Sequence, residues 1–130
     1  MLTFTIPAPC EPLTANQRLH WAVKAKRTKA WRARAQVAVI QAGRPTLDRA
    51  HVTVTVHRTD RRSYDAGNWY PTAKACLDGI VTDGHVLPDD SNTYVVGPDL
   101  RRGDKRDVFT LVVTLDPDCD CRDCVERWAA

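Results

Sequence analysis

The segment His51–His57 alternates strictly between valine and polar side chains, and this alternation constrains the fold more than any other feature of the chain. A period of two is typical of a β-strand with one buried and one exposed face. Leu2–Ile6 alternates with threonine in the same way, and Val108–Leu115 is an almost wholly apolar strand. The chain is therefore expected to build a sheet whose core lies on one face.

Two segments are predicted to be helices that cover this sheet. Residues 19–42 contain no Gly or Pro and are rich in Ala, Lys, Arg and Gln, and a second helix is expected from about Pro71 to Val81. A short strand is predicted at residues 93–96, followed by a loop over residues 97–106. The order β-α-β-α-β-β predicts an α/β (α+β) fold, with a single mixed sheet and two main helices packed on it.

The length of 130 residues favours one domain, placed at residues 1–116, with a cysteine-rich tail over residues 117–130. No apolar run approaches the roughly 20 residues of a membrane span, and the first residues lack the basic start of a signal peptide. We therefore expect a cytoplasmic protein that does not contact a membrane. In that compartment the five cysteines are expected to be reduced thiols or metal ligands.

Positive charge is concentrated at the start of the chain. Residues 1–47 hold eight Lys and Arg and a single acid, whereas residues 48–130 hold eleven Lys and Arg and fifteen Asp and Glu. Basic side chains on the first helix would neutralise phosphates and bind DNA by its shape, although a solvated helix face would have the same composition. The candidate DNA contacts are Arg18, Lys24, Lys26, Arg27, Lys29, Arg61 and Arg62.

Several carboxylates and one lysine follow the valine-rich strand. Asp65 lies in the loop after it, Lys74 and Asp78 are one turn apart on the second helix, and Asp89-Asp90 precedes a strand. Hard oxygen ligands for Mg²⁺ together with a cation near the phosphate are what metal-dependent phosphodiester hydrolysis requires. The alternative is that the loop acids stabilise turns and that the Lys–Asp pair lies on a solvated face.

The segment from Asp65 to Ser91 resembles the signature of RusA-type Holliday junction resolvases, in a phage-like variant. That signature has a D-x-D-N motif, a helix lysine, an Asp four residues later and a D-D-[SA] element. A proline-rich loop followed by Asn16, Arg18 and Trp21 is also similar, so the resemblance covers roughly residues 2–115. It departs from the family at Gly67, which stands where the second acid of D-x-D-N is expected.

The resemblance implies a homodimeric crossover junction endodeoxyribonuclease that cuts four-way DNA junctions in recombination and repair. It implies Mg²⁺ as cofactor, with Mn²⁺ as an alternative, and action in the bacterial cytoplasm from a phage or prophage gene. The catalytic residues it implies are Asp65, Lys74, Asp89 and Asp90, and the metal ligands are Asp65, Asp78 and Asp90. Here Asp78 or another acid replaces the carboxylate missing at Gly67, or the activity is weakened.

Two other functions are open. A basic DNA-binding module that has lost nuclease activity would be consistent with Gly67. A restriction-type nuclease is disfavoured, because neither Glu11 nor Glu126 is followed by the lysine of an E-x-K motif.

The tail contains three cysteines, Cys119, Cys121 and Cys124, in C-x-C-x-x-C spacing. These could bind Zn²⁺ with a fourth ligand such as Cys10 or a histidine. Because a second C-x-x-C is missing, free thiols on a frayed terminus are favoured over a zinc site. The strand residues His51 and His57 are expected to face solvent or a second layer rather than a metal.

Overall fold

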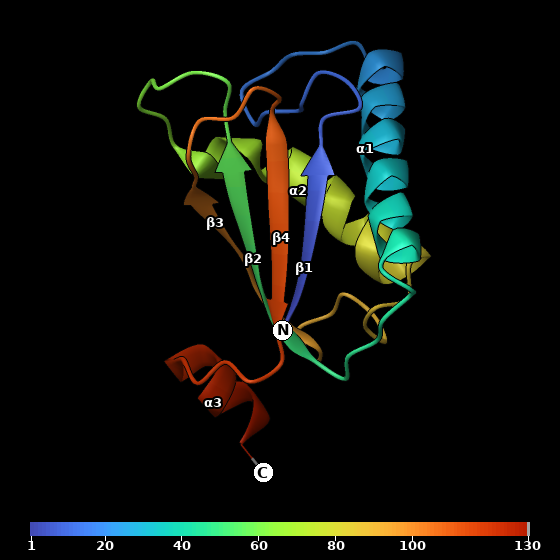
Figure 1. The fold of residues 1–130 in the computed structure, drawn as a ribbon, viewed down its shortest axis with the longest axis vertical. Coiled ribbons are helices and arrows are strands. Elements are labelled where there is room, and N and C mark those ends of the chain that lie inside the picture. Colours follow the sequence, from blue (N-terminus) through green and yellow to red (C-terminus); the bar gives the residue numbers. More distant parts are fainter. Residues whose placement is uncertain (130) are drawn as a thin grey trace.

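Four strands form one mixed sheet in the order β1-β4-β2-β3 (Figure 1). β1 (Leu2–Pro7) and β2 (Ala50–His57) both pair antiparallel with β4 (Thr110–Asp116), and β3 (Val95–Arg102) lies parallel to β2. This computed structural model describes residues 1–129. The predicted α+β class with one mixed sheet is confirmed.

The core lies on the face of the sheet that the alternating apolar residues share. In the two central strands the fully buried residues are Ala50, Val52, Val54, Val56, Leu111, Val113 and Leu115. Between them Thr53 and Thr55 remain half-buried on the opposite face. The period of two in the sequence therefore marks the buried face correctly.

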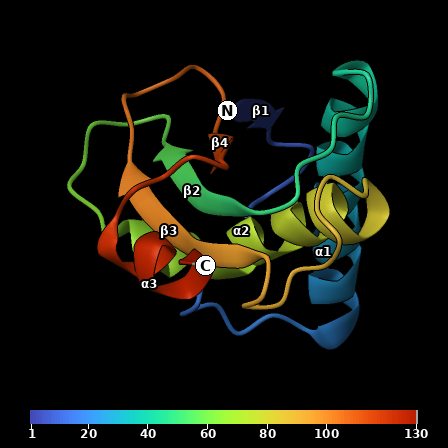
Figure 2. The same cartoon turned by 90° about the horizontal axis from the view of Figure 1, so that it is seen from below.

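Two helices cover this face (Figure 2). α1 (Trp21–Gln41) and α2 (Tyr70–Asp78) pack against each other, and α2 continues as a wider turn over Gly79–Asp83. A Cβ atom at Gly79 would collide with the backbone carbonyl of Arg32, so glycine is what permits the close crossing. The two predicted helices are thus present, with ends that differ by a few residues.

The predicted loop over residues 97–106 is wrong in its first half, because β3 extends to Arg102. Its residues 99–102 pair with residues 53–56 of β2. β3 is an edge strand with charged side chains, so it lacks the apolar alternation that identified β2.

The expectation of a frayed tail is also wrong, since residues Arg122–Trp128 form a third helix, α3. It lies beside β3, at the end of the sheet where β2 begins (Figures 1 and 2). Arg127 Nη1 donates to the carbonyl of Val95 at 2.7 Å, and Trp128 Nε1 donates to that of Thr93 at 3.0 Å. Of the predicted tail, residue 130 lies outside the described residues.

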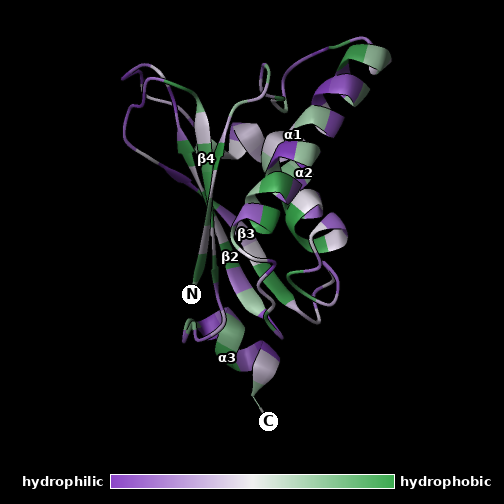
Figure 3. Cartoon of the chain, turned by 45° about the vertical axis from the view of Figure 1, so that its right-hand side comes forward, coloured by the Kyte–Doolittle hydropathy of each residue, from purple (hydrophilic) through white to green (hydrophobic). Residues whose placement is uncertain are grey.

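The loops at the opposite end of the sheet come from three parts of the sequence. Segments 8–20, 58–65 and 103–109 and the first turns of α1 all lie at the end remote from α3 (Figure 1). Figure 3 shows the N-terminal part of α1 projecting away from the sheet, and residues 21–26 of it are exposed. Among residues 1–129, no helix has the length and apolar character needed to cross a membrane.

Candidate functional site

Lys74 joins two carboxylates that are distant in the sequence. Its Nζ donates to Asp78 Oδ1 at 2.8 Å and to Asp90 Oδ2 at 2.7 Å. Helix α2 places Lys74 and Asp78 one turn apart, and the loop before β3 brings in Asp90. We call these three residues the lysine–aspartate cluster. The sequence predicted the helix pair, and the structure adds Asp90 to it.

The charges of the cluster support one another. The hydrogen bond from Lys74, together with its positive charge, lowers the pKa of Asp90. Partial burial opposes the charge of Lys74, yet the hydrogen bonds to Asp78 and Asp90 raise its pKa above the ordinary value. The ammonium and the Asp90 carboxylate are therefore both charged near neutral pH.

The other two predicted acids have local roles. Asp65 Oδ1 accepts from the Gly67 N–H at 3.0 Å, and Asp89 Oδ1 accepts from the Ser91 N–H at 2.7 Å. No hydrogen bond or ion pair among residues 1–129 joins either acid to Lys74. In the same residues no three carboxylates meet closely enough to hold one ion, so the predicted set Asp65, Asp78 and Asp90 is not assembled.

Asp65 instead lines an open cleft of about 490 Å³, whose wall also includes Asn16, Arg58 and Asn68. The proline-rich N-terminal loop forms one side of this cleft, because the Ala15 N–H donates to the Asn68 carbonyl at 2.8 Å. The proline-rich loop and the segment that contains Asp65 and Asn68 are thus neighbours in space.

The predicted DNA contacts are largely accessible. Arg18, Lys24, Lys26, Lys29, Arg61 and Arg62 are exposed, and Arg27 is half-buried. The segments that carry them lie at the end of the molecule remote from α3 (Figure 1). Trp31 is fully buried in the core, whereas Trp21 is 76% exposed beside the lysines of α1. Whether these residues bind DNA stays a prediction.

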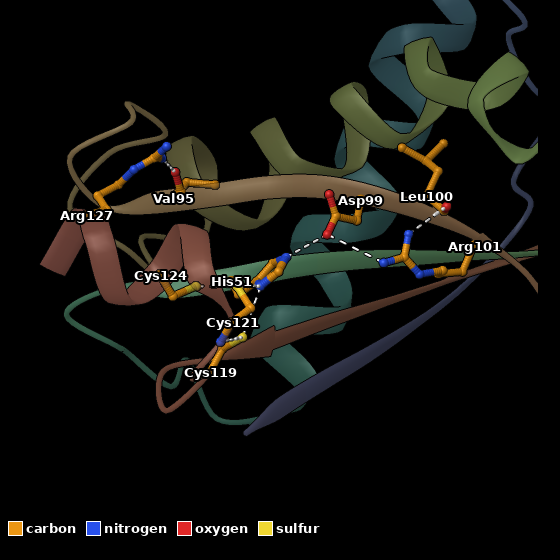
Figure 4. Close-up of polar contacts among 9 residues, drawn as sticks. All are labelled: His51, Val95, Asp99, Leu100, Arg101, Cys119, Cys121, Cys124 and Arg127. Carbon is orange, nitrogen blue, oxygen red and sulfur yellow. Dashed lines mark hydrogen bonds and ion pairs between the residues drawn. The ribbon is translucent and has the colours of Figure 1, made fainter.

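A second cluster lies beside α3, at the end of the sheet where β2 begins (Figure 1). His51, at the start of β2, meets Cys119, Cys121 and Cys124 from the tail, and their four ligand atoms lie within 4.8 Å of one another (Figure 4). His51 Nδ1 is 3.1 Å, 3.4 Å and 3.6 Å from the three sulfur atoms in that order. This His/Cys₃ cluster could bind a metal such as zinc.

His51 does not face solvent: it is half-buried and lies against the three cysteines of the tail, which covers this face of the sheet. His51 lies on the polar face of β2, 68 residues before Cys119, and the tail folds back onto that face. Cys10 is not part of the cluster. His57 is 8% exposed and its Nδ1 lies 2.8 Å from the Asp104 carbonyl, away from the cluster. The cysteine spacing was the only sequence signal, and it could not identify the histidine.

Contacts within the cluster shift the pKa values of two of its thiols in opposite directions. A hydrogen bond from the Cys124 backbone, supported by the neighbouring side chains, lowers the pKa of Cys121 to about 7. Burial, followed by hydrogen bonds from the other thiols, raises the pKa of Cys124 to about 12. His51 Nε2, on the far side of the ring, lies 2.7 Å from Asp99 Oδ2 (Figure 4).

In comparisons with known proteins, no family model and no curated protein matches this chain.

Proposed function

We propose that this chain is a divalent-metal-dependent endonuclease that cuts four-way DNA junctions, similar to RusA-type resolvases. The observation that carries the proposal is the lysine–aspartate cluster. The helix lysine and the second acid of the D-D-S element, 16 residues apart, meet at 2.7 Å. The resemblance in sequence requires these two residues to act together, and their contact supports that requirement.

The donor chemistry of the cluster is compatible with Mg²⁺. Mg²⁺ is usually held by one or two carboxylates, with waters and substrate phosphates completing its shell. Asp78 and Asp90 are two such carboxylates, and both form ion pairs with the ammonium group of Lys74. A cation bound there would act as a Lewis acid toward the phosphate and would lower the pKa of a bound water.

Lys74 has two roles in this proposal. Its ammonium holds the two carboxylates in fixed positions, because it donates a hydrogen bond to each of them. With 41% of its side chain exposed, it can also reach a phosphate and stabilise the negative charge that develops there during hydrolysis. Asp65, on the wall of the cleft beside the N-terminal loop, and Asp89 are the remaining acids of the proposed site.

The basic segments would bind the DNA. α1 and the loop that contains Arg61 and Arg62 present positive charge at one end of the molecule, where it can follow phosphates without reading bases. Two symmetric cuts in a junction require two sites, and a homodimer with a two-fold axis is the simplest way to provide them. We place this activity in a bacterial cytoplasm, in phage or prophage recombination and repair.

A DNA-binding module without nuclease activity is the second candidate. It is favoured by the engagement of Asp65 and Asp89 in local turns and by the absence of a three-carboxylate group in residues 1–129. In this case Lys74 would only neutralise its two neighbours.

The deciding experiment is cleavage of a synthetic four-way junction by the full chain, with Mg²⁺ and after its removal. The enzyme should produce paired symmetric cuts only with the metal, and Asp90→Asn should bind the junction without cutting it. Asp48→Asn is the matched control, because Asp48 is an exposed acid outside the cluster. Tight binding without cleavage in Mg²⁺ and in Mn²⁺ would reject the enzyme in favour of the binding module.

A further inference from the structure

The His/Cys₃ cluster has the dimensions of a tetrahedral metal site. With Zn–N near 2.0 Å and Zn–S near 2.3 Å, a tetrahedral ion holds nitrogen and sulfur about 3.5 Å apart. His51 Nδ1 lies 3.1–3.6 Å from the three sulfur atoms. The four donors come from a strand and from a tail 68 to 73 residues later, so chain proximity does not account for their convergence.

We propose that His51, Cys119, Cys121 and Cys124 form a structural zinc site that fastens α3 to the start of β2. Three thiolates and one imidazole are a soft donor set, which selects zinc over Mg²⁺ or Ca²⁺. With four protein ligands no position is left for a water or a substrate. The site therefore acts on the structure of the tail and not on the chemistry of the lysine–aspartate cluster.

Asp99 orients the His51 ring from the side opposite the thiols. Asp99 Oδ2 lies 2.7 Å from His51 Nε2, which is the carboxylate–histidine arrangement that commonly supports metal ligation. A carboxylate on Nε2 favours the tautomer in which Nδ1 is free to bind the metal. Arg101 Nη2 lies 3.6 Å from the same oxygen (Figure 4), and its positive charge offsets the negative charge of three thiolates and Asp99.

The contacts of α3 outside the cluster are few and mostly exposed. Arg127 and Trp128 donate to backbone carbonyls before and within β3, and Arg49 stacks 5.1 Å above the Trp128 ring. Cys124 is the one buried residue of this helix. A helix of seven residues is too short to be stable alone, so metal ligation would supply the missing free energy.

The test is the metal content of the full chain, purified under reducing conditions and measured by plasma mass spectrometry. We expect one zinc per chain, and we expect Co²⁺ added to the metal-free protein to give the visible spectrum of tetrahedral cobalt with a thiolate charge-transfer band. Cys119→Ser and His51→Ala should each lower the zinc content by about tenfold or more. Cys10→Ser is the control, because Cys10 is half-buried but lies outside the cluster, and it should retain zinc.

A second readout follows the tail itself. Removing zinc with a chelator should expose the segment after β4 to limited proteolysis, while residues 1–116 remain resistant. The proposal is overturned if the reduced wild-type chain neither contains zinc nor gives the cobalt spectrum, or if both variants retain zinc. A disulfide between two tail cysteines in freshly reduced protein, seen as the loss of two hydrogens by mass spectrometry, would also overturn it. The cobalt titration uses the wild-type chain and so does not depend on the folding of a variant.

Discussion

His51 Nε2 and Asp99 Oδ2 lie 2.7 Å apart, across the pair of parallel strands β2 and β3. Asp99 thereby fixes the orientation of the imidazole, and the other ring nitrogen, Nδ1, lies next to the three thiols. This contact joins β2, which the alternation in the sequence predicts clearly, to β3, most of which was predicted to be a loop.

Asp99→Asn should weaken zinc binding by about 10-fold to 100-fold, because the amide supports the histidine less strongly than the carboxylate does. Competition with a chromophoric chelator measures the change in affinity. Arg101→Gln is the control, since it removes the ion pair with Asp99 but leaves the contact with His51, and its effect should be smaller. Equal affinity in wild type and Asp99→Asn would show that the carboxylate does not support a metal ligand.

Lys74→Ala should lower the turnover of junction cleavage far more than it lowers junction affinity. The ammonium stabilises charge that appears only in the transition state, and it also holds Asp78 and Asp90 in place. Single-turnover cleavage and a gel-shift titration give the two quantities separately. Equal losses in both would mean that Lys74 is an ordinary phosphate contact.

Gly67→Asp should lower the Mg²⁺ concentration needed for half-maximal cleavage and raise the rate at limiting metal. A side chain at Gly67 would begin 3.3 Å from Asp65 Oδ1, so the new carboxylate would stand beside the existing one. Cleavage rates over a Mg²⁺ titration measure the effect. Gly67→Asn has the same size without the charge, and an equal response to both substitutions would contradict a role in binding metal.

Replacing Lys24, Lys26, Arg27 and Lys29 together by alanine should weaken junction and duplex binding about equally. Each lost phosphate contact should make the slope of log affinity against log salt shallower by about 0.9. Fluorescence anisotropy at several salt concentrations measures the slope. Arg122→Ala on α3, at the other end of the molecule, should leave it unchanged, and an unchanged slope in the α1 variant would mean that this helix does not face DNA.

Asp83→Asn should make the free energy of unfolding depend less on pH in the acid range. The hydrogen bonds from Arg32 lower the pKa of Asp83, so its folded-state pKa lies below the unfolded value of about 3.9. The contribution of this pair is complete above the unfolded pKa and is lost as pH falls through the folded one. Urea unfolding from neutral pH into the acid range should show wild type and variant converging in acid. Parallel profiles would show that the pair does not contribute.

The elements that sequence predicted correctly are those with strong local signals. Alternation in β2 and the uninterrupted helical composition of α1 depend on neighbours along the chain, and both elements are present. The pair of Lys74 and Asp78 was also readable, because residues four apart on a helix share a face.

The rest depends on contacts between distant residues. The second half of β3 is polar because it lies at an edge, and its pairing with β2 is set by the sheet and not by its own residues. The cysteine spacing left the fourth ligand open, because His51 comes from a strand 68 residues earlier. That Asp65 acts together with Asp90 stays a prediction.

The position of the His/Cys₃ cluster has a kinetic consequence. His51 begins a central strand and the cysteines follow β4, so the pairing of β2 with β4 brings the four donors together in the native sheet. A metal that binds only this paired arrangement would be acquired late and would not nucleate the sheet. Contacts that are absent from the transition state leave the folding rate unchanged and slow unfolding. Zinc at this place would therefore prolong the lifetime of the native chain without helping it to form.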